Sequence, residues 1–158
     1  MDKNVKIIAH LGMGIALYVA LGMAIKVPLV GNIQTDLGYV AFGAFLYAIG
    51  WPAFIVGMFG ACLESIVVSG WVPVGWMAGQ ALVGLVCGAM YKKTNSILVQ
   101  TAFTIVAMFL GIAVLKTGIE CFLYGIPLQV KFFKNVVAFV ADTVPMLIGL
   151  YVGRRICR

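Results

Sequence analysis

The segment IIAHLGMGIALYVALGMAIKV, residues Ile7 to Val27, decides how the rest of this chain is interpreted. A small residue recurs at every fourth position, and a helix places these residues in one stripe: Gly12, Ala16, Ala20 and Ala24. Leu, Ile, Val and Met fill the other faces. In lipid, close approach of backbones across small residues is a main source of helix association. The stripe is therefore predicted to dock against another helix, either inside this chain's own bundle or on a separate protein.

The composition places the whole chain in a membrane. It has 158 residues, of which 63% are hydrophobic and 10% are charged, whereas soluble domains are about half apolar and about a quarter charged. The net charge of +6 does not indicate a nucleic-acid partner, because most basic residues stand at the ends of apolar segments. The chain is also too small for most complete transporters, which build their site between two repeats or bundles.

The sequence predicts no metal site, no cofactor and no ATP hydrolysis by the chain itself. The four cysteines form no CxxC pair and have no histidine nearby, so zinc and haem spacings are absent. His10 is the single histidine and is interpreted as an interfacial polar residue. No GxxxxGK[ST] phosphate loop is present.

Hydropathy and turn residues predict an all-α integral membrane protein with six transmembrane helices in a single domain over residues 1–158. The predicted spans are 7–27, 39–49, 53–69, 76–91, 97–115 and 136–152. The second span is short, and the connection 116–135 is expected to include a partly buried or re-entrant piece. Seven basic residues on one side against four on the other place both termini in the cytoplasm.

Three polar residues are expected in the outer half of the membrane: Glu64, Gln80 and Asp142. A carboxylate at such a depth is costly, so it is treated as a candidate functional group. The alternative is a structural carboxylate bonded to a lysine or a backbone amide. Helical phase places Glu64 with Gly57, Gly60 and Ala61 on one face of the third span, which predicts an interior surface.

Loops and helix ends add further polar and aromatic groups near this depth. Buried charges under aromatic and hydrogen-bonding side chains are typical of a pocket for a small, flat, polar molecule. Trp71 and Trp76 have the alternative role of interfacial tryptophans. The candidate binding residues are Asn32, Gln34, Asp36, Glu64, Trp71, Trp76, Gln80, Lys131, Asn135 and Asp142.

Four sequence features together resemble one known family. They are the A-x-x-x-A stripe of the first span, the Gly50-Trp51-Pro52 break, the pattern GWMAGQALVGLVCG over 75–88, and FFKN over 132–135. With the size and predicted topology, the chain resembles the substrate-binding S components of energy-coupling factor (ECF) transporters, the vitamin importers of bacteria and archaea. The resemblance covers nearly the whole chain.

The resemblance implies a function and partners. An S component of this family is not an enzyme; it lies in the cytoplasmic membrane of a prokaryote and binds its vitamin from outside. Its stripe, here Gly12, Ala16, Ala20 and Ala24, docks on a transmembrane coupling subunit. Two ATPases on that subunit power toppling of the S component, which releases the substrate inside. Asn135 with Lys131 or Lys134 would line the pocket, and the loop 27–38 would be its gate.

The substrate stays open at this point. Asp36, Glu64 and Asp142 favour an amine or a cationic ring, while Lys131 and Lys134 could bind a carboxylate or a phosphate. The weak preference is a nitrogen heteroaromatic: a pterin, a deazapurine such as a queuosine precursor, or a thiamine-, pyridoxine- or flavin-like vitamin. The alternatives are a stand-alone secondary carrier or channel with the carboxylates as a proton relay, and a small membrane enzyme acting on lipid or peptide.

Overall fold

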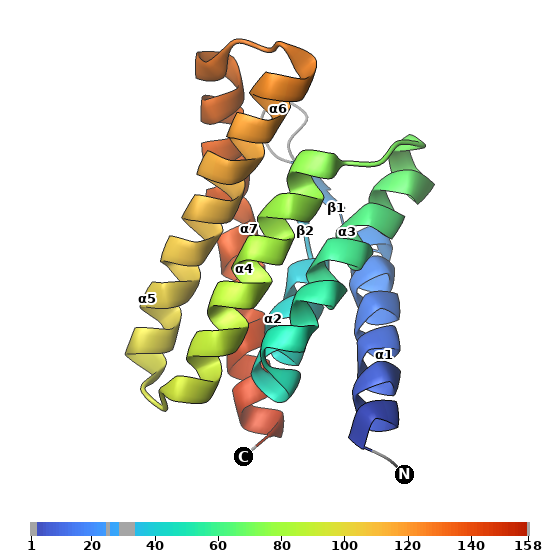
Figure 1. Ribbon diagram of the computed structural model, residues 1–158, viewed down its shortest axis with the longest axis vertical. Coiled ribbons are helices and arrows are strands. Elements are labelled where there is room, and N and C mark those ends of the chain that lie inside the picture. The colour runs from blue at the N-terminus through green and yellow to red at the C-terminus, as the bar shows by residue number, and fades with distance from the viewer. Residues whose placement is uncertain (1–2, 25, 29–33, 158) are drawn as a thin grey trace.

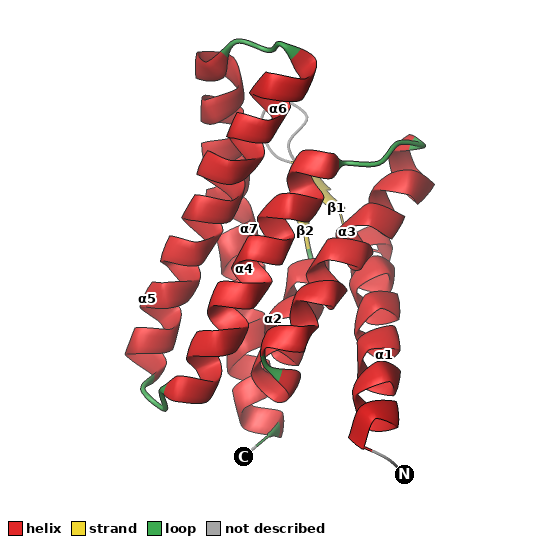
Figure 2. Ribbon diagram, viewed as in Figure 1, coloured by secondary structure: helices red, strands yellow, loops and turns green. Residues whose placement is uncertain are grey.

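The chain folds as a bundle of helices with one short β-hairpin at one end (Figure 1). The computed structural model describes residues 3–24, 26–28 and 34–157. The helical elements are α1 (Lys3–Ala24), α2 (Gly38–Ile49), η2 (Trp51–Ala53), α3 (Phe54–Ser69), α4 (Val74–Lys93), α5 (Ile97–Met108), η3 (Phe109–Lys116), α6 (Thr117–Tyr124) and α7 (Leu128–Ile156). Strands β1 (Lys26–Pro28) and β2 (Gln34–Asp36) pair antiparallel, with Lys26 opposite Asp36. Figure 2 shows how small this hairpin is beside the helices.

The expected all-α membrane protein is confirmed. Within the described residues, five helical segments are long and apolar enough to cross a membrane, by length and composition. The short second span is also found, because α2 has only 12 residues. The predicted turn after α2 occurs at Gly50, where a φ of 87° favours glycine.

The prediction of a long connection over 116–135 is wrong. Helix α5 continues through the π-helix η3 into α6 and ends at Tyr124, and α7 already begins at Leu128. The charges of Lys116 and Glu120 gave this stretch the character of a helix end. In the folded chain the two side chains form an ion pair of 3.5 Å one helical turn apart, which allows the helix to continue through them.

Helix α2 lies at the centre of the bundle and packs most closely on α7. Glycines make the close approach possible: a Cβ added to Gly43 would lie 2.5 Å from the carbonyl oxygen of Met146. Tyr39, Phe42 and Leu46 on α2 are fully buried in the apolar core. The hairpin, the α3–α4 connection and the α6–α7 turn gather at one end of the bundle, while α1 begins and α7 ends at the other (Figure 1).

Candidate functional site

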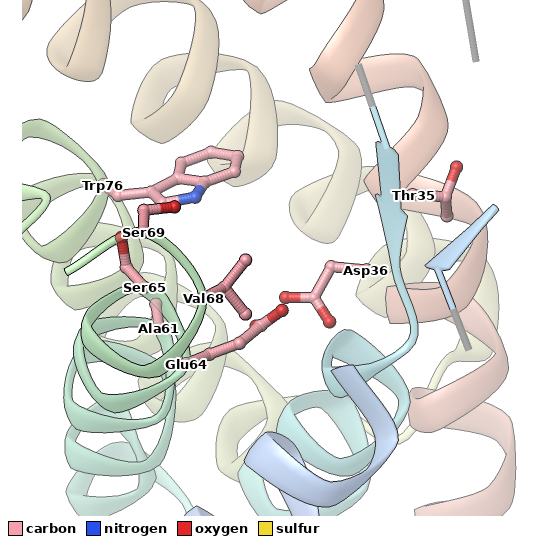
Figure 3. A pocket seen from close by; sticks show the side chains of 8 residues that line it. All are labelled: Thr35, Asp36, Ala61, Glu64, Ser65, Val68, Ser69 and Trp76. Carbon is pink, nitrogen blue, oxygen red and sulfur yellow. The ribbon is translucent and has the colours of Figure 1, made fainter. Parts of the chain in front are cut away.

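A hollow opens beneath the hairpin, at the end of the bundle away from the chain ends (Figure 3). Its volume is about 170 Å³, and it is bounded by β2, α3 and the start of α4. The lining residues are Thr35, Asp36, Ala61, Glu64, Ser65, Val68, Ser69 and Trp76. The side chains of Asp36 and Glu64 point toward each other across it. Carboxylates and hydroxyls therefore dominate this hollow, which we call the acidic end.

A second hollow of about 280 Å³ adjoins the first and is bounded by α3, α4, α6 and α7. It shares Ser65, Ser69 and Trp76 with the acidic end. Its other lining residues are Trp71, Pro73, Lys116, Glu120, Lys131, Lys134, Asn135 and Ala138. We call it the basic end. Each hollow alone is below the roughly 300 Å³ at which ligand pockets begin. Because they share three lining residues, a ligand that occupied both would have a site of suitable size.

Asp36 connects the hairpin to two helices. Its carboxylate accepts hydrogen bonds from the Tyr18 hydroxyl on α1 (2.8 Å) and from the backbone N–H of Gly38 (2.6 Å). Its own backbone N–H donates to Oδ1 of Asp142 on α7 (3.2 Å). Asp142 is 1% exposed and lies behind the cavity lining. Its position therefore fits the structural alternative, a carboxylate that holds a backbone amide.

Glu64 approaches Asp36 from α3, and the absence of a side chain at Gly22 on α1 gives the two carboxylates the space that they occupy. The Cβ of a residue at position 22 would lie 2.7 Å from both Asp36 Oδ1 and Glu64 Oε2, so only glycine fits there. The predicted interior face of α3 is confirmed, since Gly57, Gly60, Ala61 and Glu64 are all buried.

The environment of Asp36 changes its acidity. Burial, followed by the charge and the hydrogen bond of the neighbouring Glu64, raises the pKa of Asp36 from 3.8 to about 7. The hydrogen bonds from Gly38 and Tyr18 act in the opposite direction. Asp36 thus takes up a proton more readily than an isolated aspartate would.

Trp76 separates the two ends of the site. The ammonium of Lys116 lies 4.2 Å from the centroid of its ring, a cation–π contact. The ring also packs edge-on against Tyr39 at 6.4 Å between centroids. Gln80, one turn further along α4, donates from its side-chain amide to the Tyr39 hydroxyl. Tyr39 thereby fixes both α4 residues against α2.

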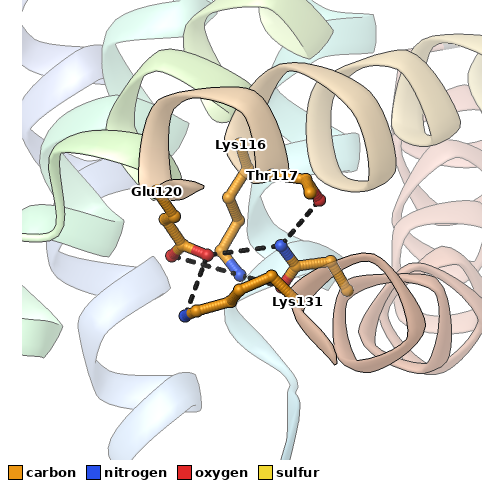
Figure 4. A network of polar contacts seen from close by, with 5 residues as sticks. Lys116, Thr117, Glu120 and Lys131 are labelled. Atoms are coloured by element: carbon orange, nitrogen blue, oxygen red, sulfur yellow. Dashed lines mark hydrogen bonds and ion pairs between the residues drawn. The ribbon is translucent and has the colours of Figure 1, made fainter. Parts of the chain in front are cut away.

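A buried polar network forms the floor of the basic end (Figure 4). Lys116 Nζ donates to Asn135 Oδ1 (2.5 Å), and Asn135 Nδ2 donates to Thr117 Oγ1 (2.9 Å) and Glu120 Oε2 (3.3 Å). Lys131 pairs with Glu120 at 3.1 Å. Because every member has a partner, the network holds α6 against α7 in one arrangement.

Most of the predicted site residues meet in this region. Asp36, Glu64 and Trp76 line the acidic end, and Trp71, Lys131 and Asn135 line the basic end. Gln80 is 1% exposed and packs beneath the lining. Asn32 and the side chain of Gln34 lie outside the described residues, as does much of the predicted gate loop 27–38.

Sequence reasoning missed several lining residues. Lys116 stands at the start of the expected connection and is not among the predicted pocket residues, although its i, i+4 spacing from Glu120 within an apolar stretch is a usable signal. Ser65 and Ser69 also line both hollows, and their spacing from Glu64 and Ala61 on α3 could have placed them there. Gly22 carries no signal that separates it from other helix glycines.

The small-residue stripe lies on the outside of α1. Gly12, Ala16, Ala20 and Ala24 are exposed, and a Cβ on Gly12 would meet nothing within 4 Å. The buried face of α1 is instead formed by Gly14, Tyr18 and Gly22. An apolar groove follows the stripe, lined by Met13, Ala16, Leu17, Ala20 and Phe45. The stripe is therefore not used for packing inside the described bundle.

One family model matches nearly the whole chain. Residues 2–156 match the family described as the S component of the ECF-type riboflavin transporter. The UPF0397 protein of Streptococcus agalactiae is 24% identical over 162 residues, covering 94% of this chain and 88% of that protein. The UPF0397 protein of Lactobacillus acidophilus is 24% identical over 157 residues, covering 92% and 84%.

A UPF0397 protein of Streptococcus thermophilus is 27% identical over 93 residues, a match that covers 58% of this chain and 51% of that protein. The chain therefore spans about half the length of that relative. Among solved structures, the S component for biotin from an ECF-type ABC transporter matches with a TM-score of 0.70 at 15% identity. That match covers 99% of this chain and 94% of the other, and it is a likeness of fold.

Proposed function

Because this chain belongs to the family of ECF-type riboflavin transporter S components, we propose that it captures a vitamin or a related nitrogen heteroaromatic from outside the cell. The substrate then enters through an importer that partner ATPases drive. The family consists of substrate-binding transporter subunits, and the bacterial relatives and apolar helices make this a multi-pass membrane protein.

The observation that carries the proposal is the joined cavity beneath the hairpin. It has carboxylates at one end, lysines at the other and a tryptophan between them. Such a site can hold a flat ring by its face and by its polar edges at the same time. The hairpin is one of the segments at this end of the bundle, and its residues Thr35 and Asp36 line the acidic end. It would serve as the gate that closes over a bound molecule.

The exposed stripe of α1 supports docking of this chain on a separate membrane subunit, the partner that the family resemblance implies. Helix α1 is the least buried of the five long apolar segments. In its apolar 18-residue stretch 17% of the residues are buried, against 33% to 44% in the other four. Its outer face combines small residues with an apolar groove, which suits close packing of a second helix in lipid. We assign this face to a transmembrane coupling subunit that carries two ATPases. The topology would place both chain ends in the cytoplasm.

The proposal is tested by native mass spectrometry of the full chain purified in detergent from its expression host. A small heteroaromatic retained at one molecule per chain is the expected result. Uptake of that molecule is then measured in cells with and without the coupling subunit and its ATPases. Uptake that persists without them would replace the proposal by the stand-alone carrier, and turnover by the purified chain would replace it by the enzyme.

A further inference from the structure

The two ends of the cavity have opposite hydrogen-bonding character. At the acidic end, Asp36 and Glu64 face each other and are accompanied by the hydroxyls of Ser65 and Ser69. Asp36 and Glu64 share one hydrogen bond, and once ionised both carboxylates can only accept hydrogen bonds. Gln80, one turn along α4 from Trp76, adds a buried carbonyl oxygen that has no hydrogen-bond partner among the described residues. A ligand edge that suits this end must therefore supply N–H donors.

The basic end presents donors and positive charge. Lys116, Lys131 and Lys134 line it together with the single carboxylate of Glu120. Glu120 is already paired with Lys116 and Lys131. Among the described residues Lys134 has no ion-pair partner, and its side chain is exposed at the mouth of the cavity. A ligand group that suits this end is an anion, because it would meet an excess of cations.

Trp76 lines both hollows, so a ligand that reaches from one end to the other must pass along it. The ammonium of Lys116 lies over one face of its ring, so a flat molecule would stack on the other face. The required ligand is thus a planar ring whose donor-rich edge and anionic substituent lie on opposite sides.

We infer that the substrate is a flat heteroaromatic with adjacent N–H donors at Asp36 and Glu64 and an anionic group at Lys131 and Lys134. This ligand class presupposes the proposed function. An amidine-type edge, as in a 2-amino-4-oxopyrimidine ring, presents two parallel N–H groups that match a carboxylate bidentately. The dione edge of a flavin ring presents two carbonyl acceptors around a single N–H, and it would set those acceptors against carboxylates. The site therefore favours the amino-substituted ring over the flavin after which the matching family is named.

Two matched probes test the acidic end. Pterin-6-carboxylate and lumazine-6-carboxylate differ only in an amino group that is replaced by an oxo group. Dissociation constants are measured on the full chain in nanodiscs by quenching of tryptophan fluorescence. We expect pterin-6-carboxylate to bind roughly 10- to 100-fold more tightly, the range for a hydrogen bond to a charged group. Pterin without the carboxylate tests the basic end and is expected to bind roughly 10-fold more weakly than pterin-6-carboxylate.

Two variants assign each effect to its end of the cavity. Glu64→Gln should reduce the amino-to-oxo preference and leave the carboxylate effect, whereas Lys134→Gln should do the reverse. If Glu64→Gln does not fold, the wild-type probe series and Lys134→Gln still decide the question. Equal or tighter binding of lumazine-6-carboxylate overturns the inference. Riboflavin is the fourth probe. If the protein binds riboflavin but neither pterin nor pterin-6-carboxylate, the inference is overturned and the proposed function stays intact. Folded protein that binds none of the four probes overturns the inference, and native mass spectrometry and the uptake measurement then decide the proposed function separately.

Discussion

Replacing Gly22 by alanine tests the geometry of the acidic end directly. The added Cβ would lie 2.7 Å from Asp36 Oδ1 and Glu64 Oε2, where ordinary contacts begin at 3.4 Å. Asp36 cannot withdraw freely, because Tyr18 and the backbone of Gly38 hold its two oxygens at 2.8 and 2.6 Å. Gly12→Ala is the matched control on the same helix, since its Cβ would meet nothing within 4 Å.

The expected magnitudes follow from two opposing contributions. Overpacking at a filled site costs about 1–3 kcal/mol, and a displaced hydrogen bond adds about 1 kcal/mol. Alanine in place of glycine inside a helix contributes up to about 1 kcal/mol of stability in both variants. Gly22→Ala should thus lose roughly 1–3 kcal/mol while Gly12→Ala is neutral or slightly stabilised.

Thermal unfolding in detergent, followed by tryptophan fluorescence, measures the difference between the two variants. The two variants differ by about 1–4 kcal/mol, so at about 2–4 °C per kcal/mol for a chain of this size Gly22→Ala should melt roughly 2–16 °C below Gly12→Ala. It should also lose affinity for any ligand retained by the wild-type protein, whereas Gly12→Ala should keep it. Equal melting temperatures and equal ligand retention would refute the assigned approach of α1 to Asp36 and Glu64.

Three further predictions concern the gate, the partner and pH. Asp142→Asn should keep the hairpin in place because its carbonyl oxygen can still accept the backbone N–H of Asp36, whereas Asp142→Ala should increase hydrogen exchange at Asp36; equal exchange in both would contradict the anchoring role. Ala16→Leu with Ala20→Leu should abolish co-purification with a coupling subunit and leave ligand binding unchanged, and lost ligand binding in a folded variant would place the stripe in the pocket instead. The pKa of Asp36 is raised from 3.8 to about 7 in the fold, so its contribution to stability is present below about pH 4 and is lost as pH rises through about 7. Affinity for pterin-6-carboxylate should rise over the same interval as Asp36 ionises, and an affinity that stays constant from about pH 5 to about pH 8 would remove Asp36 from the binding edge.

The fold class could be predicted from two properties of the sequence: the high share of hydrophobic residues and the length of the apolar segments, which match the thickness of a bilayer. The interior face of α3 followed from helical phase, and the structure confirms it in Gly57, Gly60, Ala61 and Glu64. The strands of the hairpin, Lys26–Pro28 and Gln34–Asp36, are three residues each and too short to show an alternating pattern. Tertiary contacts hold them in place, such as the hydrogen bonds that join Asp36 in β2 to Tyr18 and Asp142.

The site was predicted less completely, since its members come from distant parts of the chain. Asp142 and the backbone N–H that it accepts are 106 residues apart, and no local pattern joins them. Helix α1 carries small residues on two faces, so spacing alone could not show that Gly14 and Gly22 face inward while Ala16 and Ala20 face outward. Packing decides between the two faces, because Tyr18 lies on the inward one.

The π-helical turns at Phe109–Lys116 have a genetic consequence. A π-helix carries an extra residue relative to an α-helix of the same run. Because the wider turns take up that residue locally, deletion of one codon in this segment would return it to an α-helix and leave the residues beyond it close to their present phase. Lys116 and Glu120 would then still face the cavity. A one-codon deletion in the regular helix α5 would instead rotate everything beyond it by about 100°, so the site should tolerate the first deletion better than the second.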